Sequence, residues 1–305
     1  MRSATASITS NPVLITGAST GIGRSTALHL AAQGYTVFAG VRREADGAAL
    51  VAAAPAASTA RIVPVLLDVT RDDQIRAALA RIEAHAPDGQ GGPGGLYALI
   101  NNAGFNLNGA FEYTSEADAR ALMDTNVGGL AALSRAALPL LRRHAARHPG
   151  TTAKLVNIGS IGSYIGIPWE AYYHASKFAV LGLSEAMRHE LWPQGIRVVA
   201  VCPGGIVTDF MPKTEAGLAA GMAALPADAP PNYRAGMRKL LAMAGMASRL
   251  GSPPEAVAKR IGKVLATNRP RMRYMVGVDA RLLLGLRRCL PEAWFHALIR
   301  SQFTA

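Results

Sequence analysis

Cysteine is almost absent from this chain, which holds only Cys202 and Cys289 among its 305 residues. Two cysteines so far apart in the sequence cannot form a disulfide framework or a structural zinc site, so we expect a reducing compartment and no bound metal. Long apolar runs are missing as well. Residues 1–12 contain none, so no signal peptide is predicted. The run LLLGL at 282–286 is far shorter than the ~20 residues of a membrane span. We therefore expect a cytoplasmic protein.

Acidic residues are scarce toward the C-terminus. Residues 232–305 contain 14 Lys and Arg but only Glu255, Asp279 and Glu292, a net charge of 14 − 3 = +11 out of +12 for the whole chain. One interpretation is a solvated basic tail that aids solubility; the other is a surface for anionic lipid or an acidic partner. No nucleic-acid-binding motif accompanies the charge, so we expect no nucleic-acid partner.

Half of the residues are apolar and 17% are charged, which is typical of a globular chain. Short apolar runs alternate with helical patterns. Because these runs are apolar on both faces, the pattern predicts an α/β fold with a doubly wound parallel sheet in a single domain, 1–305. An insertion at 209–251 and a basic, apolar tail at 280–305 belong to this domain. The predicted strands are 12–16, 35–41, 61–69, 96–104, 153–160, 196–205 and 271–277.

The glycine-rich segment TGASTGIG, at 16–23, follows the first predicted strand and opens a helix. Gly17 would allow a tight turn, Gly21 would let the backbone approach a pyrophosphate, and Gly23 would let the helix pack against the sheet. The free N–H groups at the helix N-terminus would face the phosphates. The alternative is an ordinary strand–helix turn.

Two tyrosines and a lysine stand out in SYIGIPWEAYYHASKFAVLGLSEAM, at 163–187. Residues four positions apart share a helix face, so Tyr173 and Lys177 lie together, whereas Tyr172 is rotated by about 100°. A nearby ammonium favours the phenolate and lowers the pKa of a tyrosine, so this pair could exchange a proton with an alcohol or carbonyl oxygen. The alternative is a phenol packed under a lysine that reaches for solvent.

Several further segments occur together with these two motifs. They are LDV at 67–69, NNAG at 101–104, DTNVGG at 124–129, NIGS at 157–160, YHASK at 173–177 and PGGIVT at 203–208. Together they resemble the short-chain dehydrogenase/reductase family in its compact form, from about Pro12 to Thr208. The resemblance implies a Rossmann-type fold and an NAD(P)-dependent oxidoreductase. The tail is similar, more loosely, to hydroxysteroid and retinol dehydrogenase-like members.

The resemblance also implies the catalytic residues, which are Tyr173, Lys177, Ser160 and Asn126. Ser160 precedes Tyr173 by thirteen residues and would hydrogen-bond the substrate oxygen, with Ser163 as the rival. In the family the lysine also holds the nicotinamide ribose, and an asparagine positions a water that relays protons. Asn126 fits that role, and it could also be a helix-kink residue.

The end of the second predicted strand indicates which nicotinamide cofactor is used. Relatives that prefer NAD carry an acid there, but Val41 takes that place and Arg42 follows, which suits the 2′-phosphate of NADP. Thr20 stands at the family's second basic position, so NAD stays possible. Asp68 would hydrogen-bond the adenine, and Ile206 and Thr208 would contact the nicotinamide carboxamide. The expected cofactor-binding residues are Gly17, Ser19, Thr20, Gly21, Ile22, Gly23, Arg42, Asp68, Val69, Asn102, Ala103, Gly104, Tyr173, Lys177, Pro203, Ile206 and Thr208.

The insertion at 209–251 should cover the site and contains five of the ten methionines, Met211, Met222, Met237, Met243 and Met246. Flexible thioethers suit an adaptable apolar pocket, or a lid packed on itself. We expect a lipophilic secondary alcohol or ketone as substrate: a hydroxysteroid, a retinoid or a long-chain keto compound. A non-catalytic NADP-binding regulator on the same fold would need the loss of a catalytic residue, but Tyr173, Lys177 and Ser160 are all present. Epimerases and dehydratases of related fold usually show TGxxGxxG, which this chain lacks.

The C-terminal segment 280–300 combines large aliphatic residues with arginines, and Pro291 divides it into two short helical pieces. Such a segment can lie at a bilayer interface, cover the substrate pocket or pack against a second subunit. We rank packing against protein above membrane binding, and we expect a homodimer or a homotetramer.

Overall fold

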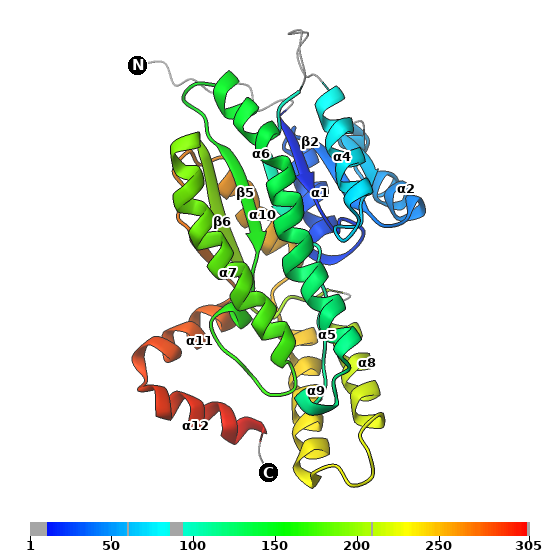
Figure 1. Ribbon diagram of the computed structural model, residues 1–305, viewed down its shortest axis with the longest axis vertical. Coiled ribbons are helices and arrows are strands. Elements are labelled where there is room, and N and C mark those ends of the chain that lie inside the picture. The colour runs from blue at the N-terminus through cyan, green and yellow to red at the C-terminus, as the bar shows by residue number, and fades with distance from the viewer. Residues whose placement is uncertain (1–10, 60, 86–93, 209, 304–305) are drawn as a thin grey trace.

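The computed structural model describes residues 11–59, 61–85, 94–208 and 210–303. Within them, seven parallel strands form one sheet in the order β3-β2-β1-β4-β5-β6-β7. Helices lie on both sides of this sheet (Figure 1), which confirms the predicted doubly wound fold. The strands are β1 Pro12–Ile15, β2 Thr36–Val41, β3 Ile62–Leu66, β4 Ala98–Asn101, β5 Ala153–Ile158, β6 Ile196–Pro203 and β7 Arg273–Val276.

The alternation of side chains along each strand divides the core into two layers. In β1, Val13 and Ile15 belong to a buried cluster with residues of the helices α1 (Gly21–Ala32) and α10 (Pro254–Leu265). Leu14 belongs to a second cluster with residues of α4 (Asp72–Ala84) and α6 (Leu130–Arg147). Central strands that are buried on both faces explain the continuous apolar runs in the sequence. Pro64 lies in β3, which is the edge strand beside β2. Proline is largely confined to such strands because it has no N–H group to donate to a neighbouring strand.

Helices fill the connections between strands. The helices before β6 are α1 Gly21–Ala32, α2 Glu44–Ala52, α3 Ala56–Thr59, α4 Asp72–Ala84, α5 Glu116–Met123, α6 Leu130–Arg147 and α7 Ala171–Leu191. After β6 come α8 Phe210–Ala223, α9 Pro231–Leu250, α10 Pro254–Leu265, α11 Val278–Cys289 and α12 Glu292–Phe303. Short turns are η1 Phe111–Tyr113, η3 Ile161–Ser163 and η4 Trp192–Gln194. A π-helical segment, η2 Asp124–Gly129, lies between α5 and α6, where the sequence pattern predicts one continuous helix over about 116–147. The glycine-rich segment PDGQGGPGG at 87–95, whose composition predicts a flexible loop, lies mostly outside the described residues.

The insertion forms α8 and α9, which extend beyond the sheet at the lower end in Figure 1. A third buried cluster joins this pair to the C-terminus, because Met237 and Leu240 of α9 pack with Phe303 of α12. Met222 packs against the same cluster, whereas Met243 and Met246 are exposed. The insertion therefore packs partly on itself and partly on the tail. The side chain of Met211 lies outside the described ones.

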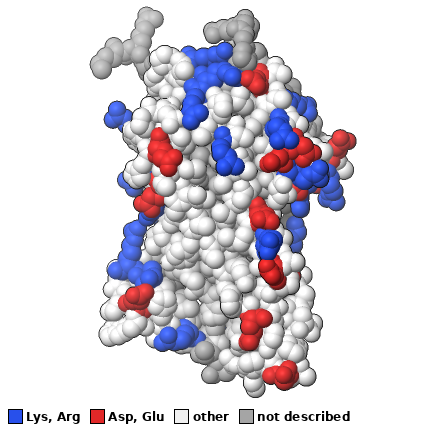
Figure 2. Space-filling view, viewed as in Figure 1, with Lys and Arg blue, Asp and Glu red and all other residues white. Residues whose placement is uncertain are grey.

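The tail uses only one side of its two helices for packing. Phe295 and Phe303 are buried, whereas Val278, Leu282 and Trp294 are exposed. No helix among the described residues is long and apolar enough to cross a membrane. Figure 2 shows charged side chains mainly around the margins of one face, with a broad uncharged area over α7.

Candidate active site

The glycine loop lies between β1 and α1, at the carboxyl edge of the sheet. Gly17 and Gly21 have φ angles of +64° and +53°, a region that favours glycine. A Cβ atom added to Gly23 would overlap the carbonyl oxygen of Gly17. The loop is thus a close-packed backbone turn ahead of a helix N-terminus. Its form fits the phosphates of a dinucleotide.

The NNAG segment supports this loop from the neighbouring strand. The Asn102 side-chain amide donates to the carbonyl oxygens of Thr16 and Gly17, at 2.9 and 3.2 Å. The Thr16 hydroxyl accepts from the backbone N–H groups of Asn102 and Ala103, at 3.0 and 2.9 Å. Asn102 therefore holds the turn in shape through its side chain, a role that the sequence did not reveal.

The segment after β6 approaches the glycine loop from the other side. The side chain of Thr208 would lie 3.2 Å from a Cβ atom on Gly21, so the two loops are in close contact. Ile206 is buried and pairs with Ser252. Asp279, at the start of α11, accepts a hydrogen bond from the Gly205 N–H group at 2.6 Å. No short motif points to Asp279, because it lies 74 residues from Gly205 along the chain.

The end of β2 presents two arginines with different surroundings. Arg43 pairs with Asp46 through two hydrogen bonds, of 3.0 and 2.7 Å, so its guanidinium is engaged within the protein. Arg42, directly after the buried Val41, is exposed, as is Arg43. At the end of β3, Asp68 is half-buried, and one of its oxygens accepts from the Thr70 N–H and hydroxyl groups at 2.9 and 2.7 Å. The other residue predicted there, Val69, is buried.

Lys177 lies on the same face of α7 as Tyr173, as its spacing predicted. Its Nζ atom is 5.7 Å from the centre of the Tyr173 ring and donates to the Ile158 carbonyl oxygen at 3.0 Å. Burial lowers the pKa of Lys177 to about 8. An amine with this pKa can exchange protons near neutral pH.

Tyr173 differs from the expectation of a lowered pKa. Burial raises the pKa of Tyr173 to about 12, and the hydrogen bond with Ser160 opposes this only in part. Desolvation of the phenolate therefore outweighs the favourable neighbours in this structure. The phenol holds its proton at neutral pH and is available as an acid.

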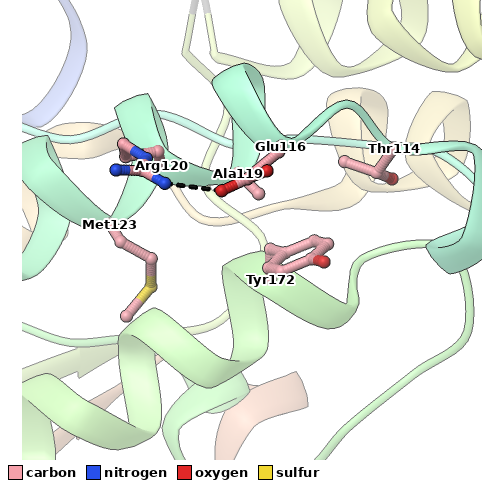
Figure 3. A pocket seen from close by; sticks show the side chains of 6 residues that line it. All are labelled: Thr114, Glu116, Ala119, Arg120, Met123 and Tyr172. Carbon is pink, nitrogen blue, oxygen red and sulfur yellow. Dashed lines mark hydrogen bonds and ion pairs between the residues drawn. The ribbon is translucent and has the colours of Figure 1, made fainter.

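Tyr172 belongs to a different surface, which explains why only one of the two adjacent tyrosines faces Lys177. Its ring stacks on Phe111 with centroids 5.4 Å apart. It also lines a surface hollow of about 330 Å³ with Thr114 and Met123 (Figure 3). In the same hollow, Arg120 forms an ion pair with Glu116.

Ser160 and its rival Ser163 have separate positions in the turn after β5. The Ser160 hydroxyl accepts from the Gly162 N–H group at 3.0 Å, and its contact with Tyr173 places it in the site. Ser163 is buried, and its hydroxyl accepts from the Ser160 N–H group at 3.2 Å. Ser163 thus closes the turn, and Ser160 is the serine beside the phenol.

Asn126 is buried in the π-helical segment η2 and bridges two parts of the site. Its side chain accepts from the Phe105 N–H group at 3.0 Å and donates to the Phe105 carbonyl oxygen at 2.9 Å. It also donates to the Ser176 hydroxyl at 3.1 Å. π-Helical segments occur often at functional sites. The two predicted interpretations of Asn126, as a kink residue and as a site residue, are compatible here.

Comparison with known proteins identifies the family. The family model described as short chain dehydrogenase matches residues 11–219. A 3-ketodihydrosphingosine reductase from Bacteroides thetaiotaomicron is 32% identical over 289 residues, which cover 94% of this chain and 96% of the relative. The chain therefore belongs to the short-chain dehydrogenase family.

Solved structures share the same fold over nearly the whole chain. A short-chain dehydrogenase from Streptomyces avermitilis has a TM-score of 0.72 and 29% identity, covering 96% of this chain and 98% of that one. A short chain dehydrogenase from Burkholderia cenocepacia in complex with NADP has a TM-score of 0.69. Its identity of 23%, over 96% of this chain and 98% of that one, shows likeness of fold alone.

Proposed function

We propose that this protein is an NADP-preferring ketoreductase that interconverts a lipophilic secondary alcohol and the corresponding ketone. The observation that carries the proposal is the set of Tyr173, Lys177 and Ser160 at the carboxyl edge of β5, beside a glycine loop built for a dinucleotide. Ligands of open α/β sheets bind at this edge.

A protonated Tyr173 suits the reducing direction. A bound nicotinamide would supply hydride to the carbonyl carbon. Tyr173 would donate its proton to the carbonyl oxygen, because burial keeps the phenol neutral. The Ser160 hydroxyl would hydrogen-bond the same oxygen as its negative charge develops. Lys177, whose pKa burial lowers to about 8, would stabilise the phenolate until a proton returns.

The end of β2 supports NADP over NAD. Both arginines are exposed, but Arg43 is engaged by Asp46, whereas Arg42 directly follows the place where the family's acid would stand. A guanidinium suits a phosphate through charge-assisted hydrogen bonds. Arg42 is therefore the residue that we assign to the 2′-phosphate.

The substrate assignment rests on the insertion and on one relative. Met243, Met246 and Leu250 are exposed on α9, spaced so that they share one helix face. An apolar face of this kind suits an apolar substrate. The Bacteroides relative is named for a keto compound, 3-ketodihydrosphingosine. These observations favour a long-chain or polycyclic ketone over a small acid.

A turnover screen tests the proposal. The purified protein is mixed with NADPH or NADH and with steroid ketones, retinal, long-chain aliphatic ketones or acyl thioesters, and the loss of reduced cofactor is followed. We expect NADPH-dependent turnover of at least one lipophilic ketone. Binding of NADPH without turnover of any of these compounds would favour the alternative, a non-catalytic NADP-binding regulator.

A further inference from the structure

Two buried ionisable side chains beside Tyr173 have no part in the reaction as described above. Glu170 and His174 are 8% and 7% exposed and lie one helical turn apart at the start of α7. Burial of such groups is costly unless they have partners. Their contacts therefore indicate what they do.

The His174 ring connects α7 to the turn that carries Ser160. Its Nδ1 atom lies 3.2 Å from the carbonyl oxygen of Gly162. A carbonyl oxygen only accepts hydrogen bonds, so Nδ1 must carry the hydrogen. An added Cβ atom on Gly162 would lie 2.9 Å from Nδ1, so the ring is packed directly against this turn.

Glu170 faces the other nitrogen of the ring. Its Oε2 atom lies 3.6 Å from His174 Nε2, which has no hydrogen-bond partner among the described residues. Its Oε1 atom accepts from the Asn106 amide at 2.6 Å. The 3.6 Å separation is too long for a hydrogen bond, so Glu170 lies beside the ring, and among the described residues the imidazole hydrogen-bonds through Nδ1 alone.

The backbone before Glu170 is also fixed. Trp169 has a φ angle of +70°, the only positive φ of a non-glycine residue in the described part of the chain. Its carbonyl oxygen accepts from the Gly109 N–H group at 2.8 Å, and its ring packs against the cluster that joins α9 to α12. A strained residue held by its surroundings in this way is often found near a functional site.

A single residue, Gly162, connects His174 to the Ser160 hydroxyl. Gly162 accepts from His174 through its carbonyl oxygen, and its N–H group donates to the Ser160 hydroxyl at 3.0 Å. That bond takes an acceptor position of the hydroxyl and leaves its hydrogen for another partner. Anchoring Gly162 therefore fixes the direction in which Ser160 can donate.

We propose that His174 is a positioning residue for this active site. The Nδ1–H group of His174 holds the Gly162 carbonyl so that the Ser160 hydroxyl points to the same substrate oxygen as the Tyr173 phenol. The proposal rests on the ketoreductase function proposed above. Its distinguishing feature is that one ring nitrogen, Nδ1, does the positioning.

Two matched variants separate the two nitrogens. The amide nitrogen of asparagine can take the place of Nδ1, whereas that of glutamine reaches the place of Nε2. With the best ketone from the screen, we expect His174→Asn to keep kcat within about threefold of wild type, and His174→Gln to lower kcat about tenfold, because a small misplacement of a catalytic group is costly. The KM for NADPH should stay unchanged in both. Equal kcat values for the two variants would overturn the proposal.

A spectroscopic measurement tests the contact without turnover. In protein with ¹⁵N-labelled histidine, the signal absent from His174→Asn identifies the His174 ring. We expect its Nδ1 atom to be protonated throughout the pH range in which the protein is folded. A neutral ring with its proton on Nε2 would overturn the proposal. If no ketone is reduced but Nδ1 is protonated, the ketoreductase function fails while the contact itself stands.

Discussion

Replacing Arg42 by aspartate should reverse the cofactor preference. In the wild type, the exposed guanidinium at the end of β2 would bond the 2′-phosphate of NADP. One charge-assisted hydrogen bond contributes about 1.5–3 kcal/mol, which corresponds to a factor of about 10 to 150 in kcat/KM for NADPH. Aspartate adds repulsion of the phosphate and offers an acceptor to the ribose hydroxyls of NAD, so the change in the NADPH/NADH ratio should exceed that factor.

The neighbouring arginine supplies the control. Arg43 is already bonded to Asp46, so Arg43→Ala should change the NADPH/NADH ratio by less than about threefold, whereas Arg42→Ala should lower it by about tenfold or more. The assay is kcat/KM for both cofactors at one fixed concentration of the best ketone. A wild type that prefers NADH, or an Arg43→Ala variant with the larger effect, would refute the assignment of Arg42.

Three further perturbations follow from the packing and the charges. Phe303→Ala removes a buried ring from the cluster with Met237, so it should lower the free energy of unfolding by about 3–5 kcal/mol and raise the KM for a lipophilic ketone. The control Trp294→Ala changes an exposed residue, so its Tm and KM should stay near those of the wild type. Equal Tm and KM values for the two variants would contradict packing of the tail on the insertion. Sedimentation with anionic vesicles at low and high salt tests whether the tail binds membranes. Because we rank packing against protein above membrane binding, we expect the wild type to stay in the supernatant. Binding at low salt that high salt releases would reverse this ranking. Burial lowers the pKa of Lys154 to about 7, below its unfolded value of about 10.5, so its charged form destabilises the fold fully below about pH 7 and progressively less as the pH rises toward the unfolded value. Lys154→Met should therefore raise Tm more at about pH 6 than at about pH 9.5, unlike the exposed-site control Lys259→Met, and a pH-independent gain would contradict the role of burial.

The sheet and the glycine loop could be predicted because local sequence determines them. Strands that are buried on both faces require continuous apolar runs, and Gly17, Gly21 and Gly23 stand where the turn needs glycine. The pairing of Tyr173 with Lys177 follows from helical spacing alone. For these features, residues that are close in the sequence are also the ones that contact each other in the structure, so the sequence pattern is enough to predict them.

Contacts between distant segments could not be predicted in the same way. The bond from Asp279 to the segment after β6 and the packing of Phe303 on α9 join parts of the chain that no short motif relates. The direction of the Tyr173 pKa shift was also missed, because the desolvation that raises it depends on the packing around the ring. The spacing of Tyr173 and Lys177 indicates that the lysine is close, but it does not indicate how deeply the Tyr173 ring is buried.

A comparison of two single-atom deletions tests the central claim most directly. Tyr173→Phe and Tyr172→Phe each remove one phenol oxygen from adjacent residues of α7, but only Tyr173 lies beside Lys177 and Ser160. NADPH-dependent reduction of the best ketone is measured for both variants, together with NADPH binding by fluorescence. We predict that Tyr173→Phe lowers kcat by about 10² or more with NADPH binding nearly unchanged, and that Tyr172→Phe stays within about threefold of wild type. Loss of activity in Tyr172→Phe with full activity in Tyr173→Phe would contradict the account.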